Sequence, residues 1–292
     1  MKIATLADWF GKGLLEGIRE SARCGAEGVQ LYAWNELNPF TLSQAMVGEV
    51  RKTAEDNGQE ITALCGELSE INPGGHALEN AAENPRQVEY LKRVLDLAAQ
   101  LTCRVVTTHI GRIPEDEQSA RYEAMLESCR ELGAYAAQMN IWVAIETGPE
   151  PVKRLCRFVD ACGAGVAVNY DPANLVMVTA DDEVEGIYTA GKRIVHTHAK
   201  DGVLHKYVGT EEIYGIFAEG GIEALASLPN FFTETPLGQG AVRWPQYLAA
   251  LQAVGYDGYL TIEREVSKDA AKDILLAVRF LQEALREMGR QQ

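Results

Sequence analysis

Short apolar runs alternate with longer segments of helical period along the whole chain. The runs are rich in Val, Ile and Thr, as buried strands are. Their spacing is mostly about 25 to 40 residues, which is long enough for a helix to connect one parallel strand to the next. Eight such runs are found, at residues 2–7, 28–34, 60–68, 103–111, 141–147, 166–172, 193–201 and 258–265.

Eight strand–helix units in 292 residues predict an α/β protein with one (β/α)8 TIM barrel domain over residues 1–292. A doubly wound sheet is the alternative, and it usually carries a glycine-rich phosphate loop after its first strand. The stretch LADWFGKGLLEG at 6–17 contains G-x-G but fails the rest of that spacing. No Pro-, Gly- or Ser-rich linker divides the chain, and several helix patterns stop at glycines 25, 58 and 163.

The seventh unit is irregular, because residues 203–243 separate its strand from the next helix pattern, WPQYLAALQAVG. Loops of this length are usually functional. The segment mixes glycines with aromatic residues, which can close over a ligand and exclude water. We therefore expect a lid over the barrel mouth or a contact between subunits. The aromatic residues are Tyr207, Tyr214, Phe217, Phe231 and Phe232.

Charge and composition narrow the possible partners. The formal net charge is −15, and a strongly acidic surface repels phosphate backbones, so we expect no nucleic-acid partner. No apolar run approaches the ~20 residues of a membrane span, and MKIATLADWF is too short and polar for a signal peptide. The six cysteines form no C-x-x-C and are typical of scattered core thiols. These features predict a cytoplasmic protein.

Four consecutive predicted strands end in a potential metal ligand. The ends are VAIE at Glu146, VNYD at Asp171, HTH at His198 and TIE at Glu263. In a barrel the carboxyl ends of the strands face the active site. Strand alternation supports an inward direction for Glu146, Asp171 and Glu263, because their outward neighbours are apolar, as packing against helices demands. The outward set is Val143, Ile145, Val166, Val168, Tyr170, Leu260 and Ile262, and the inward set includes Ala144, Asn169 and Thr261.

Three carboxylates at one mouth repel one another, and without a cation at least one of them takes up a proton. A divalent metal ion offsets the repulsion between the carboxylates. An oxygen-rich set with one imidazole suits Mn²⁺, Mg²⁺ or Co²⁺, with Zn²⁺ also possible. One layer deeper, His196 is expected to support the site or fill the core, while Lys200 and Asp201 stand where a substrate would be met.

The motifs resemble those of the xylose isomerase-like barrel superfamily. They are IE at 145–146, N-x-D-P-x-N at 169–174, H-x-H-x-K-D at 196–201, PLGQG at 236–240 and GYDGYLTIE at 255–263. This superfamily includes sugar phosphate isomerases/epimerases, ketose 3-epimerases, hydroxypyruvate isomerases and inosose dehydratases. The resemblance implies that Glu146, Asp171, His198 and Glu263 bind the metal and that the two glutamates form the acid/base pair of an epimerase.

Two positions depart from the ketose 3-epimerases. Many epimerases have a histidine three residues after the strand-six aspartate, where Asn174 stands here, and some carry an arginine at the position of Leu204. The remaining candidates for binding substrate are expected at the mouth. Together with Asn174, Lys200 and Asp201 they are Trp9, Trp34, Glu67 and His109.

The expected chemistry is the movement of a proton next to a carbonyl through a metal-stabilised enediolate. Epimerisation, aldose–ketose isomerisation and an inosose-type dehydration remain open, because the same ligands suit all three. Two more remote alternative functions are an endonuclease that acts on abasic sites and a non-catalytic sugar-binding barrel. The absence of an arginine cluster favours an unphosphorylated carbohydrate, although Arg112, Lys200 or Arg243 would overturn that. We also expect a homo-oligomer, either a dimer or a tetramer.

Overall fold

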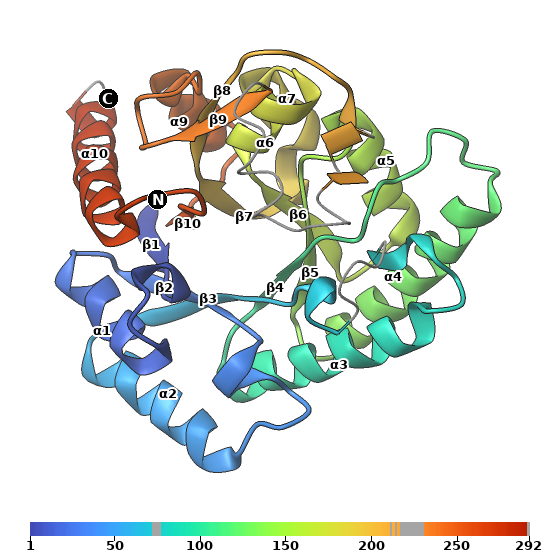
Figure 1. Ribbon diagram of the computed structural model, residues 1–292, viewed down its shortest axis with the longest axis horizontal. Helices are drawn as coiled ribbons and strands as arrows, with labels where there is room; N and C mark the ends of the chain where they lie inside the picture. The colour runs from blue at the N-terminus through green and yellow to red at the C-terminus, as the bar shows by residue number, and fades with distance from the viewer. Residues whose placement is uncertain (72–76, 211, 214, 217–230, 291–292) are drawn as a thin grey trace.

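Eight parallel strands close into a barrel in the computed structural model, which describes residues 1–71, 77–210, 212–213, 215–216 and 231–290. The order around the barrel is β1, β10, β7, β6, β5, β4, β3 and β2, so the first and last strands pair and no edge stays open (Figure 1). The predicted TIM barrel is confirmed. The strands are β1 (Lys2–Leu6), β2 (Gly28–Tyr32), β3 (Glu60–Cys65), β4 (Val105–Thr108), β5 (Trp142–Glu146), β6 (Val166–Tyr170), β7 (Ile194–Ala199) and β10 (Tyr259–Ile262).

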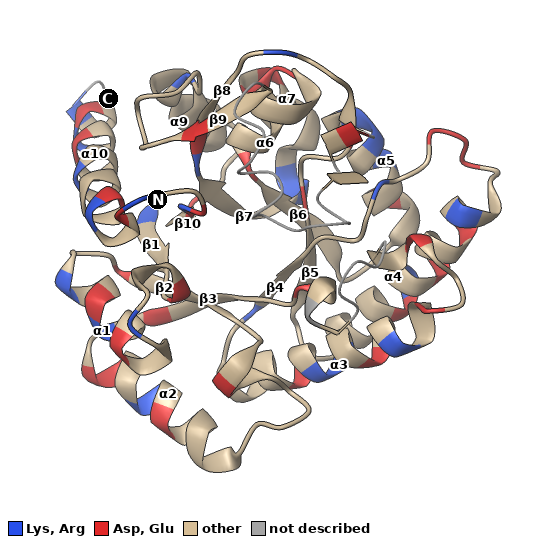
Figure 2. Cartoon of the chain, viewed as in Figure 1, with Lys and Arg blue, Asp and Glu red and all other residues tan. Residues whose placement is uncertain are grey.

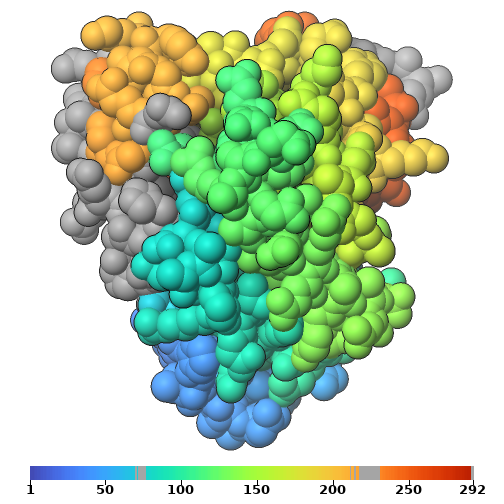
Figure 3. All heavy atoms as spheres, turned by 90° about the vertical axis from the view of Figure 1, so that its right-hand side faces the viewer, coloured from blue at the N-terminus to red at the C-terminus, as the bar shows by residue number. Residues whose placement is uncertain are grey.

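A long helix follows each strand and covers the outside of the barrel (Figure 1). The side seen face on in Figure 3 is formed mainly by the segment from α3 to α5, whose helices pack side by side. Between β6 and α7, the short α6 (Pro172–Asn174) continues into a π-helical turn, Leu175–Thr179. The long helices are α1 (Leu14–Arg23), α2 (Gln44–Asp56), α3 (Asn84–Gln100), α4 (Ala120–Gln138), α5 (Val152–Cys162), α7 (Glu183–Ala190), α9 (Trp244–Ala253) and α10 (Ala270–Arg290).

The helix ends follow from local sequence. Ser43, Ser119 and Asp182 each accept a hydrogen bond from a first-turn amide of α2, α4 and α7 through their side chains. The predicted stop at Gly163 is confirmed, since this residue follows α5 with φ 86°. Glycine adopts that left-handed conformation without the penalty of a Cβ atom.

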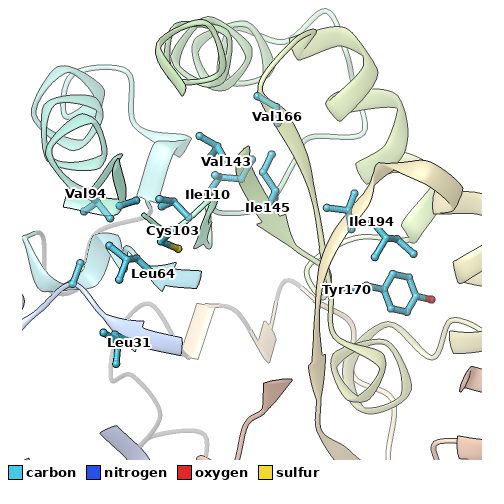
Figure 4. Close-up of a cluster of buried hydrophobic side chains, with 14 of the residues drawn as sticks. Leu31, Leu64, Val94, Cys103, Ile110, Val143, Ile145, Val166, Tyr170 and Ile194 are labelled. Atoms are coloured by element: carbon cyan, nitrogen blue, oxygen red, sulfur yellow. The ribbon is translucent and has the colours of Figure 1, made fainter. Parts of the chain in front are cut away.

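The main apolar core lies between the barrel and the helices (Figure 4). The residues predicted to face outward from β5, β6 and β10 all belong to it. Ala144, expected to face inward, does not belong to this core but to a small separate cluster with Ala63 and Val105. Because outward positions are apolar in every one of these strands, the alternation fixes which side chains enter the barrel.

The strand pairing is irregular beside the predicted ligands. The register between β6 and β7 shifts between Val168 and Asn169, just before Asp171. Such irregularities re-aim side chains and are frequent next to active sites. The shift places Asn169 opposite His196.

The segment after β7 contains a two-stranded antiparallel sheet of β8 (Asp201–Leu204) and β9 (Phe232–Thr235). Residues 211, 214 and 217–230 lie outside the described part, and with them the predicted aromatic positions 214 and 217. Tyr207 is 58% exposed. The lid or subunit contact expected for 203–243 therefore stays a prediction.

Charged side chains are spread along the outer helices (Figure 2). All six cysteines are free. Among the described residues, no helix has the length and apolar character needed to cross a membrane.

Candidate active site and metal centre

The structure brings the four predicted ligands together. Glu146 ends β5, Asp171 directly follows β6, His198 lies near the end of β7, and Glu263 directly follows β10. Each offers one ligand atom within 4.8 Å of the other three. His198 Nδ1 lies 3.4 Å from Glu146 Oε2, 3.9 Å from Asp171 Oδ2 and 3.2 Å from Glu263 Oε2. All four residues are buried, with exposures of 3%, 0%, 1% and 6% along the chain.

The pKa values of the cluster reflect the burial of its carboxylates and the repulsion between them. Burial raises the pKa of Asp171 to about 7, and the charges of Glu146 and Glu263 act in the same direction. Burial also opposes ionisation of Glu263, but His198 and Lys200 outweigh it and lower its pKa to about 2. The cluster without a cation therefore holds a proton on Asp171 near neutral pH, as three converging carboxylates require.

Two buried ligand atoms of the cluster have no hydrogen-bond partner in the described part of the chain. They are Asp171 Oδ2 and His198 Nδ1. The other oxygen of Asp171 accepts hydrogen bonds from the amides of Ala173 and Asn174, so it caps α6 and leaves Oδ2 directed at the cluster. An unpaired buried polar atom is costly, and a cation between these atoms satisfies both. The residues therefore fit a divalent ion with oxygen and imidazole ligands.

A chain of buried hydrogen bonds orients two of the ligands. His196 Nδ1 lies 2.9 Å from Asn169 Oδ1, and His196 Nε2 lies 3.1 Å from the hydroxyl of Thr261. Burial lowers the pKa of His196 to about 3, so its ring is neutral. Asn169 Nδ2 donates to Glu146 Oε2 at 2.9 Å and lies 3.4 Å from His198 Nε2. The amide of Asn169 thus sets the positions of both ligands.

Asn174 contacts the same glutamate from α6. Its Nδ2 donates to Glu146 Oε1 at 3.0 Å and to the carbonyl of Thr147 at 3.3 Å. The hydroxyl of Thr147 in turn donates to the carbonyl of Asp171 and accepts from its amide. Asn174, predicted to bind substrate, therefore lies in the site and holds Glu146 in place.

Lys200 lies beside the fourth ligand. Its ammonium donates to Glu263 Oε2 at 3.1 Å and also to Glu265 Oε2. Burial lowers the pKa of Lys200, but the two glutamates outweigh it and hold the pKa well above its usual value. Lys200 is therefore a buried cation paired with two carboxylates, close to where the sequence placed it.

His109 and Glu67 lie on the other side of Glu146. His109 Nδ1 is 3.2 Å from Glu67 Oε1, and its Nε2 is 3.6 Å from Glu146 Oε1. The thiol of Cys65 donates to the same Glu67 oxygen at 3.2 Å. Both predicted residues therefore adjoin the cluster, and they are only partly buried.

Trp9 and Trp34 flank Tyr32 on the strand ends of β1 and β2. Tyr32 stacks on Trp34 with ring centres 4.1 Å apart and meets the edge of Trp9 at 6.1 Å. Asp8 fixes this group, because its carboxylate accepts hydrogen bonds from Trp34 Nε1 and from the amide of Tyr32. Burial raises the pKa of the Tyr32 hydroxyl well above its usual value, and the charges of Glu263, Glu265 and Glu67 act in the same direction.

Asp201 does not share the arrangement of the other predicted binding residues. Its two carboxylate oxygens accept hydrogen bonds from four backbone amides and one indole, and it is 1% exposed. The sequence suggested contact with substrate, whereas the structure shows a carboxylate saturated by its own loop. The donors are the amides of Gly202, Gly238, Gly240 and Val242 and the indole of Trp244.

Several residues of the site were not singled out from the sequence as functional. Tyr32 and Asp8 lie in segments whose sequence predicts only a core strand and a turn. Thr147 lies one position beyond the ligand Glu146, and Glu265 lies two positions beyond the ligand Glu263. The position of Asn169 in N-x-D, two residues before a ligand on an inward face, was the one usable signal.

Comparison with known proteins places this geometry in a family. A family model described as xylose isomerase-like TIM barrel matches residues 18–284. An uncharacterised protein from Methanocaldococcus jannaschii is 23% identical over 230 residues, which cover 74% of this chain and 68% of that protein.

Solved structures share the fold along almost the whole chain. A xylose isomerase domain protein from Planctomyces limnophilus is 23% identical with a TM-score of 0.78, covering 99% of this chain and 97% of that one. A probable 3-DHS dehydratase from Bacillus anthracis is 17% identical with a TM-score of 0.75, covering 97% and 99%. D-psicose 3-epimerase, solved in the presence of D-fructose, is 18% identical with a TM-score of 0.71, covering 98% and 99%.

Proposed function

The chain belongs to the xylose isomerase-like TIM barrel family, and we propose that it is a divalent-metal-dependent isomerase or epimerase of a sugar or related polyhydroxy carbonyl compound. The observation that carries this proposal is the buried cluster of Glu146, Asp171, His198 and Glu263, in which two ligand atoms, Asp171 Oδ2 and His198 Nδ1, lie among carboxylate oxygens without a hydrogen-bond partner in the described part of the chain. In a purely structural cluster both buried atoms would be expected to have a hydrogen-bond partner. Mn²⁺, Mg²⁺ and Co²⁺ are the ions that suit these donors best.

When bound, the metal polarises the carbonyl of the substrate and so makes the hydrogen on the neighbouring carbon more acidic. One of the two glutamates, Glu146 or Glu263, then removes this proton, and the other returns a proton to the substrate. They come from β5 and β10, which are not neighbours in the barrel, so they approach the mouth from different sides. Their pKa values are lowered, Glu263 to about 2, so both are ionised at neutral pH and able to accept a proton.

The surrounding residues keep this pair in position. Asn169 and Asn174 donate to the two oxygens of Glu146, and Lys200 donates to Glu263. Fixed carboxylates contribute more than mobile ones, because the substrate then meets a base already at the required distance. His109, adjoining Glu146, is suited to hydrogen-bond a substrate hydroxyl.

The structural relatives support this chemistry. Sugar 3-epimerases recur among them, including the D-psicose enzyme and an L-ribulose 3-epimerase. The dehydratase from Bacillus anthracis shares the same barrel, so loss of water from a related carbonyl compound is the second candidate function. Both reactions begin with removal of the proton next to the carbonyl, and they differ in the product.

Turnover in D₂O tests the proposal. Metal-free protein is reloaded with Mn²⁺, Mg²⁺ or Co²⁺ and incubated with a panel of ketoses and aldoses, and products are identified by proton NMR. We expect an isomerised or epimerised product with deuterium on the carbon next to the carbonyl, and none with Glu146→Gln or Glu263→Gln. A product that has lost water favours the dehydratase. A product without deuterium, or no turnover across the panel, contradicts the proposed proton transfer.

A further inference from the structure

The loops after the seventh and eighth barrel strands are where TIM barrels commonly bind phosphate through backbone amides. In this chain Asp201 fills the first of these positions with a carboxylate. It accepts from the amides of Gly238, Gly240 and Val242 at 2.9, 3.2 and 3.1 Å. The fit is tight, because a Cβ atom on Gly240 would lie 2.0 Å from Asp201 Oδ1. An anion is therefore already built into this loop.

A second carboxylate fills the loop after β10. Glu234 Oε1, on β9, accepts from the amides of Glu265 and Val266 at 3.1 and 3.4 Å and from Arg264 at 2.5 Å. Glu234 is 8% exposed. The amides that could receive a phosphate after the eighth strand are thus also satisfied from within the chain.

The positive side chains of the loops that follow the barrel strands are mostly paired with carboxylates. Arg112 pairs with Glu79, Arg243 with Glu183, and Arg264 with Glu234. The remaining cations of these loops are lysines, namely Lys12 paired with Glu20, Lys200 paired with Glu263 and Glu265, and the exposed Lys206 and Lys268.

The sequence of the residues outside the described part can be checked for further positive side chains. Segments 72–76, 217–230 and 291–292 and positions 211 and 214 contain no lysine or arginine, and they add three glutamates, at 211, 219 and 223. The lysine and the arginine of the 203–243 segment, Lys206 and Arg243, therefore both lie in its described part.

The metal cluster itself offers no spare positive charge. Its three carboxylates and neutral imidazole leave one net negative charge after a divalent ion is bound, and the ammonium of Lys200 is already shared by two glutamates. Glu67 adds a further carboxylate beside His109. The strand ends of β1 and β2 carry the uncharged rings of Trp9, Tyr32 and Trp34. A second anion brought to this mouth meets electrostatic repulsion, and the donor without a hydrogen-bond partner there, the indole nitrogen of Trp9, is uncharged.

We propose that the site selects an uncharged polyhydroxy carbonyl compound and rejects the phosphate ester of the same carbon skeleton. The inference rests on the proposed function and names its substrate class. It follows from the two carboxylates that occupy the amide positions after β7 and β10, together with the pairing of every loop arginine.

Matched ligand pairs test the inference on the Mn²⁺-loaded wild-type protein. Binding by calorimetry and turnover are both measured for D-fructose and D-fructose 6-phosphate, D-ribulose and D-ribulose 5-phosphate, and D-xylulose and D-xylulose 5-phosphate. At low ionic strength we expect at least one neutral sugar to bind and its phosphate to bind at least tenfold more weakly. Added NaCl should narrow that difference, since salt screens the repulsion.

The outcomes separate this inference from the proposed function. Selective binding of a neutral sugar without turnover leaves the selectivity standing and removes the function. Equal turnover of a sugar and its phosphate leaves the proposed function standing and removes the selectivity. Tighter or equal binding of the phosphate in every pair, or no binding of any neutral sugar at millimolar concentration, overturns the inference.

Two surface variants complete the test. Lys206 and Lys268 are the exposed loop lysines for which the described contacts show no ion pair, so they are the loop cations chosen for substitution. We expect Lys206→Ala and Lys268→Ala to leave both binding constants of each pair unchanged. Selective weakening of phosphate binding in either variant reveals an anion anchor and contradicts the proposal.

Discussion

The strand ends of β5, β6, β7 and β10 carry ionisable groups gathered in one buried cluster, whereas those of β1 and β2 carry aromatic rings. In the first half each ligand is held by neighbours, as Asn169 and Asn174 hold Glu146. In the second half Tyr32 and Trp34 are held by stacking and by the carboxylate of Asp8. One half thus resembles a charged centre and the other an apolar wall.

The two halves differ in what they require from a ligand. Burying three carboxylates is expensive unless a cation joins them, and Asp171 Oδ2 is buried there without a hydrogen-bond partner in the described part of the chain. The aromatic half buries apolar surface and is stable by itself. Binding of a metal should therefore stabilise the charged half, while binding of a substrate should involve both.

The largest expected contrast is catalytic. Glu146→Gln and Glu263→Gln should each lower kcat at least about 10²–10⁴-fold, because each removes a carboxylate that accepts a proton. The matched change in the aromatic half, Trp34→Phe, retains a ring and should lower kcat/KM by no more than about tenfold. Steady-state kinetics on the substrate found by the D₂O screen measures both, with metal content determined alongside. A larger loss in Trp34→Phe than in the glutamate variants would reverse the comparison.

The second contrast concerns Glu150, which lies in the loop after β5 and contacts the loop after β4. Its carboxylate is 2% exposed and accepts from the amide of Ile113 at 3.2 Å. Burial raises its pKa to about 8. The folded state therefore keeps a proton that the unfolded state releases at the usual carboxyl pKa, so the free energy of unfolding falls as pH rises between about 4.5 and 8.

Glu150→Gln removes this titration and retains an acceptor for the Ile113 amide. Between pH 5 and pH 8.5 the wild type should lose about 2–4 kcal/mol more stability than the variant. Urea unfolding of the metal-free protein at both pH values measures the difference. Glu115→Gln is the matched control, because that side chain is 89% exposed and should leave the pH dependence as in the wild type. Identical pH dependence in Glu150→Gln and wild type would show that the carboxyl is ionised when buried.

The third and smallest contrast compares two buried amides on opposite halves. Asn169 on β6 donates to Glu146 and contacts His198, whereas Gln30 on β2 donates to Thr107 on β4. Asn169→Leu should weaken metal binding about 10–100-fold, the usual effect of removing a residue that orients a ligand. Gln30→Leu should leave it within about threefold. Calorimetric titration with Mn²⁺ compares the two, and equal weakening would mean that any buried amide of the barrel affects the metal equally.

The fold and the ligand set were predictable from sequence because both depend on local periodicity. An α/β pattern repeated eight times leaves few closed arrangements, and strand alternation decides which of Glu146 and its neighbours enters the barrel. The convergence of Glu146, Asp171, His198 and Glu263 then follows from the barrel itself, since carboxyl ends of parallel strands share one face.

The roles of other residues depend on contacts that no local pattern encodes. In the sequence Asp201 resembles the polar residues before it, yet four of its five hydrogen-bond partners lie 37 to 43 positions further along the chain. Glu234 likewise acts on amides about 30 positions away. The orientation of Asn169 depends on a register shift between β6 and β7. Such partners become visible only when the loops are placed in space.

Titration of metal-free protein with Mn²⁺ tests the central claim most directly, because it needs no knowledge of the substrate. Wild-type protein and the Asp171→Asn variant are compared by calorimetry and by elemental analysis after gel filtration, with Asp116→Asn, an exposed acid, as control. The account predicts one ion per chain in the wild type and in the control, and at least a tenfold loss of affinity in Asp171→Asn. Equal stoichiometry and affinity in all three proteins would contradict it.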